Sequence, residues 1–141
     1  MKDDSIGILL AEAIKLKLIA SGISVVICET NADYALSELI DVDLIFIIDS
    51  TYYDIKPGTV TVTPISDQLV SNSPNYSQHQ LSLIDLIKTN KEPIEGFIIG
   101  VEIAEISFGI ELSNCLSQQF NQLCNEVFNV IINITEGVKN A

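Results

Sequence analysis

The chain has 141 residues, 48% of them hydrophobic, which is enough for one domain spanning residues 1–141 with a core of its own. Its 19 acidic residues outnumber 7 basic ones and give a formal net charge of −12, which repels phosphate backbones and anionic lipid. Nucleic acid and membrane surfaces are therefore excluded as preferred partners, whereas a cation or a basic peptide segment suits this charge, and we expect a monomer.

Nothing in the sequence indicates export or membrane insertion. No apolar run approaches the roughly 20 residues that a membrane-spanning helix needs, and residues 1–4, Met-Lys-Asp-Asp, are acidic where a secretory signal is basic and then apolar. The three cysteines, Cys28, Cys115 and Cys124, show no metal-binding CxxC spacing and no disulfide framework. We therefore expect a soluble, cytoplasmic protein with reduced cysteines.

The first part of the chain predicts a helix and then a strand. From Ser5 to about residue 20, apolar side chains recur at helical spacing, and Asp4 or Ser5 stands where a helix cap is expected. Gly22 is typical of a helix end. Residues 23–27, Ile-Ser-Val-Val-Ile, form a β-branched run of strand length.

The next segment predicts a short helix and a buried strand. Residues 33–40 carry a weak helical stripe of apolar side chains, and residues 44–48, Leu-Ile-Phe-Ile-Ile, are apolar at every position. Such a run fits a strand that is covered on both faces, as in a parallel sheet. We expect it to be the most buried strand of the sheet and to end at Asp49.

A more exposed strand and a polar loop follow. Pro57-Gly58 is a turn signal, and residues 59–63, Thr-Val-Thr-Val-Thr, alternate as in a strand at the edge of a sheet. Residues 66–77 are polar and predict a loop. A helix is then expected to begin through a capping box formed by Ser77 and Gln80.

The last part predicts a strand at residues 97–101 and a long helix at residues 113–134, which carries an apolar stripe. Strands that alternate with helices predict an α/β fold. We expect an open, mostly parallel twisted sheet with helices on both faces, a three-layer sandwich of the phosphorylase/hydrolase-like kind. The chain opens with a helix, where such folds usually open with a strand.

Three polar side chains stand where an α/β sheet could bind a ligand. Asp49 follows the strand at 44–48, and ligand crevices lie outside the carboxyl ends of strands; it could equally cap a turn at Ser50-Thr51. His79 is the only histidine and stands at a helix start, where the helix dipole and burial favour a neutral, metal-binding imidazole, although single histidines are more often structural. Asp4 precedes the first helix, where an aspartate also serves as a cap.

Taken together, two carboxylates and one imidazole make a mixed oxygen and nitrogen site that suits a divalent transition metal. Asp4, Asp49 and His79 are therefore the candidate metal-binding and catalytic residues. The sequence has no phosphate-binding glycine loop, no GxSxG and no HExxH motif. A receiver-like domain with Asp49 as phosphate acceptor is an alternative, but it would need a lysine near the end of its last strand, where Val101-Glu102 stands.

Five short segments, taken in order, resemble the hydrogenase maturation endopeptidases. They are residues 3–7 (Asp-Asp-Ser-Ile-Gly), the strand ending in Asp49, residues 57–60 (Pro-Gly-Thr-Val), residues 77–81 (Ser-Gln-His-Gln-Leu) and residues 98–101 (Ile-Ile-Gly-Val). The resemblance extends over nearly the whole chain, and it too implies an α/β fold.

The resemblance implies an endopeptidase that removes a C-terminal extension from the large-subunit precursor of a [NiFe]-hydrogenase after nickel insertion, and that recognises the bound nickel. By motif, Asp4, Asp49 and His79 would contact that nickel. The metal would arrive with the substrate, so no tightly bound cofactor is expected. The three side chains would fix the scissile peptide near the metal and either polarise its carbonyl or activate a water.

Two departures from the family pattern bear on activity. The family usually begins with a strand and a Gly-x-Gly-Asn turn before the Asp-Asp segment, and it usually carries a Gly-Gly pair where this chain has Glu29-Thr30-Asn31. Side chains at these positions narrow the backbone approach of a docked peptide. Either the native chain begins upstream with the missing strand, or this is a shortened, non-catalytic relative that binds hydrogenase subunits.

Overall fold

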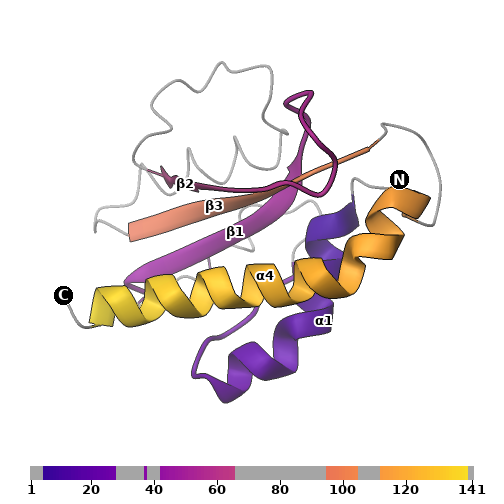
Figure 1. The fold of residues 1–141 in the computed structure, drawn as a ribbon. Helices are drawn as coiled ribbons and strands as arrows, with labels where there is room; N and C mark the ends of the chain where they lie inside the picture. Colours follow the sequence, from indigo (N-terminus) through magenta and orange to yellow (C-terminus); the bar gives the residue numbers. More distant parts are fainter. Residues whose placement is uncertain (1–4, 28–36, 38–41, 66–94, 105–111, 140–141) are drawn as a thin grey trace.

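The computed structural model describes residues 5–27, 37, 42–65, 95–104 and 112–139. The helices and strands within these ranges are α1 (Ile6–Ala20), β1 (Leu44–Thr51), β2 (Val60–Pro64), β3 (Glu95–Glu102) and α4 (Asn114–Lys139). Figure 1 shows the strands as one layer, with α1 and α4 beside it. The predicted α/β fold is confirmed.

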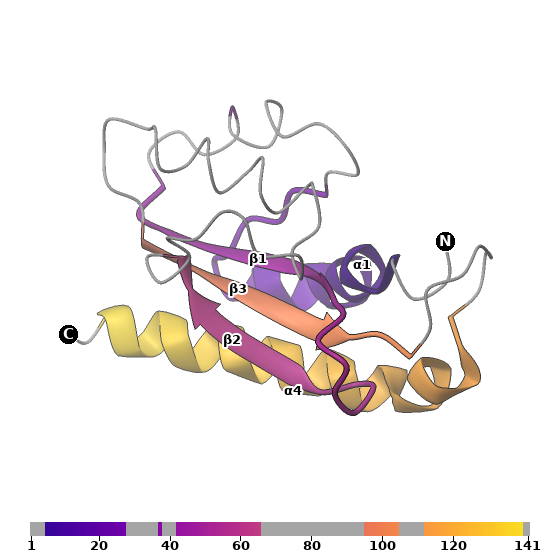
Figure 2. The same ribbon diagram turned by 90° about the horizontal axis from the view of Figure 1, so that it is seen from above.

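The described strands form one mixed sheet in the order β1-β3-β2. β1 runs parallel to β3, in a register that places Thr51 opposite Glu102 at the carboxyl ends of both strands. β2 runs antiparallel along the other side of β3, and Figure 2 shows β3 between its two neighbours. The strand predicted at residues 59–63 is confirmed as β2, which lies at one edge of the sheet formed by the described strands.

The prediction that residues 44–48 form the most buried strand was wrong. Most side chains of β3 are buried, whereas most of those of β1 are only half-buried. β3 has a neighbouring strand on both sides, while β1 pairs with β3 alone among the described strands. β1 also does not end at Asp49, because its ladder with β3 continues through Ser50 to Thr51.

Both described helices match their predictions closely. α1 ends where Gly22 adopts a φ of +84°, and the Ile23 N–H donates a hydrogen bond of 2.9 Å to the Leu18 carbonyl, the backbone arrangement for which glycine is favoured at a helix end. α4 begins after Ser113, whose hydroxyl accepts the Leu116 N–H at 3.3 Å. It continues to Lys139, beyond the predicted end at residue 134.

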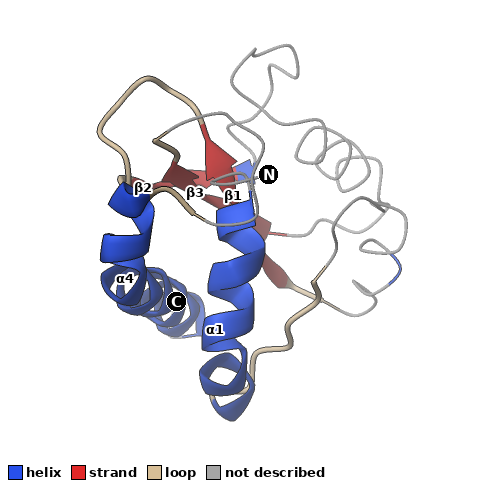
Figure 3. Ribbon diagram, turned by 90° about the vertical axis from the view of Figure 1, so that its right-hand side faces the viewer, coloured by secondary structure: helices blue, strands red, loops and turns tan. Residues whose placement is uncertain are grey.

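The core lies between the sheet and the two helices, which pack side by side on one face of the sheet (Figure 3). Each fully buried aliphatic side chain contributes roughly 1.5–3 kcal/mol by leaving water. The buried cluster consists of Ile6, Leu10, Ile14 and Leu18 of α1, Ile99 and Val101 of β3, and Leu116, Leu123, Val127 and Ile131 of α4. The apolar stripes of the sequence therefore face this core.

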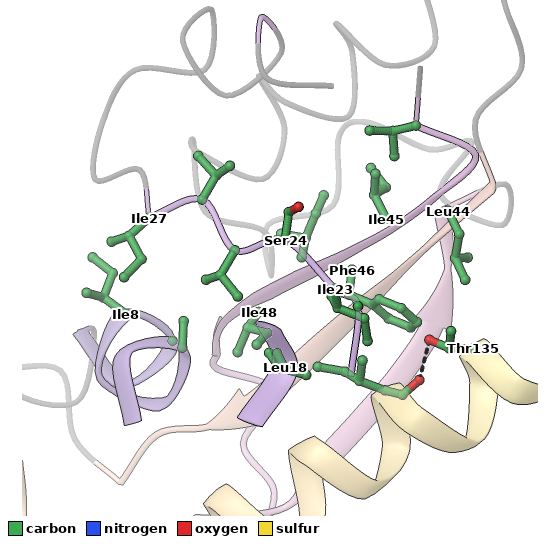
Figure 4. A pocket seen from close by; sticks show the side chains of 18 of the residues that line it. Ile8, Leu18, Ile23, Ser24, Ile27, Leu44, Ile45, Phe46, Ile48 and Thr135 are labelled. Carbon is green, nitrogen blue, oxygen red and sulfur yellow. Dashed lines mark hydrogen bonds between the residues drawn. The ribbon is translucent and has the colours of Figure 1, made fainter. Parts of the chain in front are cut away.

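Residues 23–27, predicted as a strand, are described but belong to no strand, so this prediction was wrong. A β-ladder needs a partner at about 4.8 Å. Here residues 23–27 and β1 line a common hollow of about 480 Å³ (Figure 4). β-branched composition alone therefore does not make this segment part of the sheet.

Three further predicted elements, the helix at residues 33–40 apart from Ser37, the loop at residues 66–77 and the helix that follows it, lie outside the described residues. Neither described helix has the length and apolar content required to cross a membrane.

Candidate functional site

The structure describes one of the three predicted site residues, Asp49. Asp4 and His79 lie outside the described residues, so their convergence on Asp49 stays a prediction. Within the described ranges, no group of three or more His, Cys, Asp and Glu side chains is placed to hold a metal ion. A site built on Asp49 therefore needs donors from elsewhere in the chain or from a substrate.

Asp49 lies near the carboxyl end of β1, opposite Gly100 of β3. It is half-buried, and its Oδ1 accepts the Ser50 N–H at 2.8 Å. Because Ser50 and Thr51 continue β1, there is no turn at these residues for Asp49 to cap. The carboxylate thus lies at the carboxyl ends of the parallel strands, which is where ligand crevices form in α/β folds.

The first turn of α1 packs directly on the backbone beside Asp49. A Cβ atom at Gly7 would lie 2.5 Å from the Ile48 carbonyl oxygen and 3.0 Å from the Asp49 Cα. Only glycine allows such a close approach of two backbones. Gly7 follows Asp4 by three positions in the sequence, so the helix that begins after Asp4 is held against the strand that carries Asp49.

A second carboxylate at this edge, Glu102, was not among the predicted site residues. It ends β3, is 1% exposed, and accepts a hydrogen bond of 3.0 Å from the Thr51 hydroxyl to Oε1. The sequence feature that could have identified Glu102 is its position as an acidic residue directly after the apolar run at 97–101. A receiver-like domain would need a lysine near this position to bind the phosphoryl group. The carboxylate of Glu102 stands there instead, which argues against the receiver-like alternative.

The hollow along the outer edge of β1 is apolar and distinct from the Asp49 carboxylate. Figure 4 shows Ile8 of α1, Ile23 and Ile27, and Phe46 and Ile48 of β1 around it. Among the described lining residues, Lys139 alone carries a charge. The described residues of this lining therefore offer no carboxylate, imidazole or thiolate donor to a divalent metal.

Cys124 of α4 is part of the packing between the helices. Burial raises the pKa of the Cys124 thiol, and the charge of Lys17 on α1 offsets this in part. A raised pKa keeps the sulfur in its thiol form at neutral pH, which is the inert form. Cys124 packs against the buried core cluster, as expected for a packing residue.

The sequence matches the family model of the hydrogenase maturation proteases over residues 8–130. No curated protein matches it significantly. Among solved structures, the hydrogenase maturating endopeptidase HybD from E. coli is similar, with a TM-score of 0.73 and 19% identity over 94% of this chain and 86% of that one.

The [NiFe] hydrogenase maturation protease HybD from Thermococcus kodakarensis has a TM-score of 0.65 and 25% identity, over 92% of this chain and 90% of that one. An endopeptidase from Escherichia coli has a TM-score of 0.64 and 18% identity, over 89% and 82%. The structures share the fold, and the family model spans most of the sequence. The chain therefore belongs to the hydrogenase maturation protease family.

Proposed function

We propose that the chain is an endopeptidase that removes a C-terminal extension from the large-subunit precursor of a [NiFe]-hydrogenase once nickel is in place. Membership of the hydrogenase maturation protease family is the observation that carries this proposal. In it, Asp4, Asp49 and His79 contact the nickel of the precursor. Nickel is thus part of the substrate.

The position of Asp49 supports a role in contacting substrate. It is half-buried near the carboxyl end of β1, where it combines access to solvent with a backbone fixed by the ladder to β3. The packing of Gly7 on Ile48 and Asp49 supports the part of the proposal that concerns Asp4, because it ties the start of α1 to the same strand.

In the proposed mechanism, metal recognition serves to orient the substrate. Carboxylate oxygens and an imidazole nitrogen are suitable donors to a divalent transition metal. Once they engage the nickel of the precursor, the scissile peptide is confined near the same side chains, and confinement of this kind lowers the entropic part of the barrier. The site then either polarises the scissile carbonyl or activates a water for attack on it.

The charge of the chain suits this partner. A net charge of −12 attracts a metal-bearing or basic segment of the precursor and speeds the encounter at low salt. We propose that the chain acts as a single-domain, cytoplasmic monomer.

The test is mass spectrometry of a nickel-loaded large-subunit precursor from the same organism, incubated with the chain or with its Asp49→Ala variant. The matched control is Asp43→Ala, because Asp43 is exposed and immediately precedes the other end of β1. We expect loss of a C-terminal peptide with the chain and with Asp43→Ala, and no cleavage with Asp49→Ala. Intact processing by a folded Asp49→Ala variant would contradict the proposal.

A non-catalytic role is the second candidate. Among the described strands β1 pairs with β3 alone, and residues 23–27 beside it form no strand, whereas an edge that binds a substrate peptide needs a fixed wall. Titration with Ni²⁺ or its substitute Cd²⁺ separates the two. Metal binding that depends on Asp49, without cleavage of the loaded precursor, would favour a relative that only binds hydrogenase subunits.

A further inference from the structure

Glu102 is a buried carboxylate whose two oxygens are both occupied by donors from this chain. Oε1 accepts hydrogen bonds from the Thr51 hydroxyl and the Tyr53 N–H, each of 3.0 Å. Oε2 accepts the N–H groups of Tyr53, Asp54 and Ile55 at 3.0, 3.1 and 3.4 Å. A buried charge is tolerated where such partners replace water, and each of these groups loses its partner if the carboxylate is removed.

Most of these donors come from a single loop. The N–H groups of the consecutive residues 53–55 point at one carboxylate, as in an anion-binding nest. Within the loop Asp54 has a φ of +62°, a conformation that a non-glycine residue keeps only where surrounding contacts hold it. The backbone of Glu102 also binds the loop, since it donates to the Thr59 carbonyl at 3.0 Å and accepts the Gly58 N–H at 2.9 Å.

The loop begins where β1 ends, and β1 carries Asp49. Thr51 follows Asp49 by two residues, lies opposite Glu102 in the ladder, and donates its hydroxyl to that carboxylate. Its carbonyl accepts the Ile103 N–H at 3.0 Å. The end of β1 is therefore fixed to the end of β3 through Glu102 and the residue after it.

We propose that Glu102 is a positioning residue for the proteolysis proposed above. Its carboxylate fixes the end of β1 and the loop at 53–55, and so holds Asp49 in the orientation in which it meets the nickel of the precursor. This inference rests on the proposed function, because it gives Asp49 a metal contact. Glu102 does not touch the substrate, since its oxygens are turned to Thr51 and the loop.

The experiment compares Glu102→Gln with Glu95→Gln. Glutamine keeps the size of the side chain but replaces one acceptor oxygen by an NH₂ donor, which cannot accept from the loop amides. Glu95 begins β3 and is exposed, so Glu95→Gln removes the same charge from the other end of the strand. Thr51→Val is a milder variant that removes only the hydroxyl hydrogen bond; it keeps the test informative if Glu102→Gln does not fold.

Three readouts are taken at a temperature where circular dichroism shows each variant to be folded: amide hydrogen exchange at residues 53–55, Cd²⁺ affinity, and kcat and KM for the nickel-loaded precursor. For Glu102→Gln we expect exchange at least ten-fold faster, Cd²⁺ binding about ten-fold weaker, and a kcat at least ten-fold lower with KM changed less than about three-fold. Thr51→Val should change the same quantities less, and Glu95→Gln should change none of them.

The outcomes separate the two proposals. If the unchanged chain cleaves the precursor and Glu102→Gln retains its kcat and Cd²⁺ affinity, Glu102 is only a structural residue and the inference is wrong. Unchanged exchange at residues 53–55 would also overturn it. If the unchanged chain does not cleave but binds Cd²⁺ more tightly than Glu102→Gln does, the proposed function fails while the positioning of Asp49 stands. A chain that neither cleaves nor binds metal overturns both.

Discussion

Replacing Gly7 by alanine tests the contact between α1 and the strand that carries Asp49. The added Cβ would lie 2.5 Å from the Ile48 carbonyl oxygen, roughly 1 Å short of a comfortable separation of about 3.5 Å. The neighbour is backbone held in the ladder to β3, so α1 must move, at an overpacking cost of about 1–3 kcal/mol. Alanine favours the helix by up to about 1 kcal/mol. We expect a net destabilisation of about 1–2 kcal/mol.

Gly137→Ala is the matched control, because Gly137 lies in the last turn of α4 and, apart from its chain neighbours and the adjacent backbone of its own helix, no atom lies within 4 Å of its added Cβ. Here only helix propensity and the entropy of the unfolded chain change, so this variant should be more stable by about 0.5–1 kcal/mol. Urea unfolding of both variants at one temperature gives the two free energies of unfolding. If Gly7→Ala were stabilised as much as Gly137→Ala, α1 would not pack on β1 as described.

Two further predictions concern the core and the thiol. Leu123→Ala should lower the free energy of unfolding by about 2–5 kcal/mol because the Leu123 side chain is 1% exposed. Leu16 is 81% exposed, so Leu16→Ala should change this free energy by about 0.5 kcal/mol at most. The urea midpoints of both variants check these values. Burial raises the pKa of Cys124, and the charge of Lys17 lowers it in part. Because the thiolate is the reacting form, iodoacetamide should alkylate Cys124 more slowly than free cysteine at pH 8. Lys17→Ala should slow this alkylation further. Peptide mass spectrometry measures these rates, and faster alkylation in Lys17→Ala would contradict the assigned cause.

Local sequence patterns were sufficient to predict those helices and strands whose own apolar spacing shows which side chains are buried. The stripe at 113–134 predicts α4 because its apolar side chains face one core, and the run at 97–101 predicts β3. Sheet order is not encoded in such runs. Residues 44–48 are as apolar as 97–101, yet among the described strands β3 has a neighbour on both sides and β1 on one side only. Residues 23–27 fail as a strand for the same reason, since pairing depends on a partner elsewhere in the chain.

The site was predictable only in part. The position of Asp49 near the carboxyl end of a strand could be predicted because it follows an apolar run, while its role in the site stays a prediction. Glu102 has a similar position after β3, but its role depends on hydrogen bonds from Thr51 and residues 53–55, which lie about 50 positions earlier in the sequence. The folding of that loop onto β3 cannot be inferred from local spacing.

The two carboxylates at this edge differ in what surrounds them, and this assigns them different parts in the proposed reaction. Glu102 is 1% exposed and its oxygens accept from four groups of the chain, so it cannot approach a metal held by another protein. Asp49 is half-buried and keeps access to solvent. A change at Asp49 should therefore remove a contact to the nickel itself, whereas a change at Glu102 can act on cleavage only through the geometry of β1.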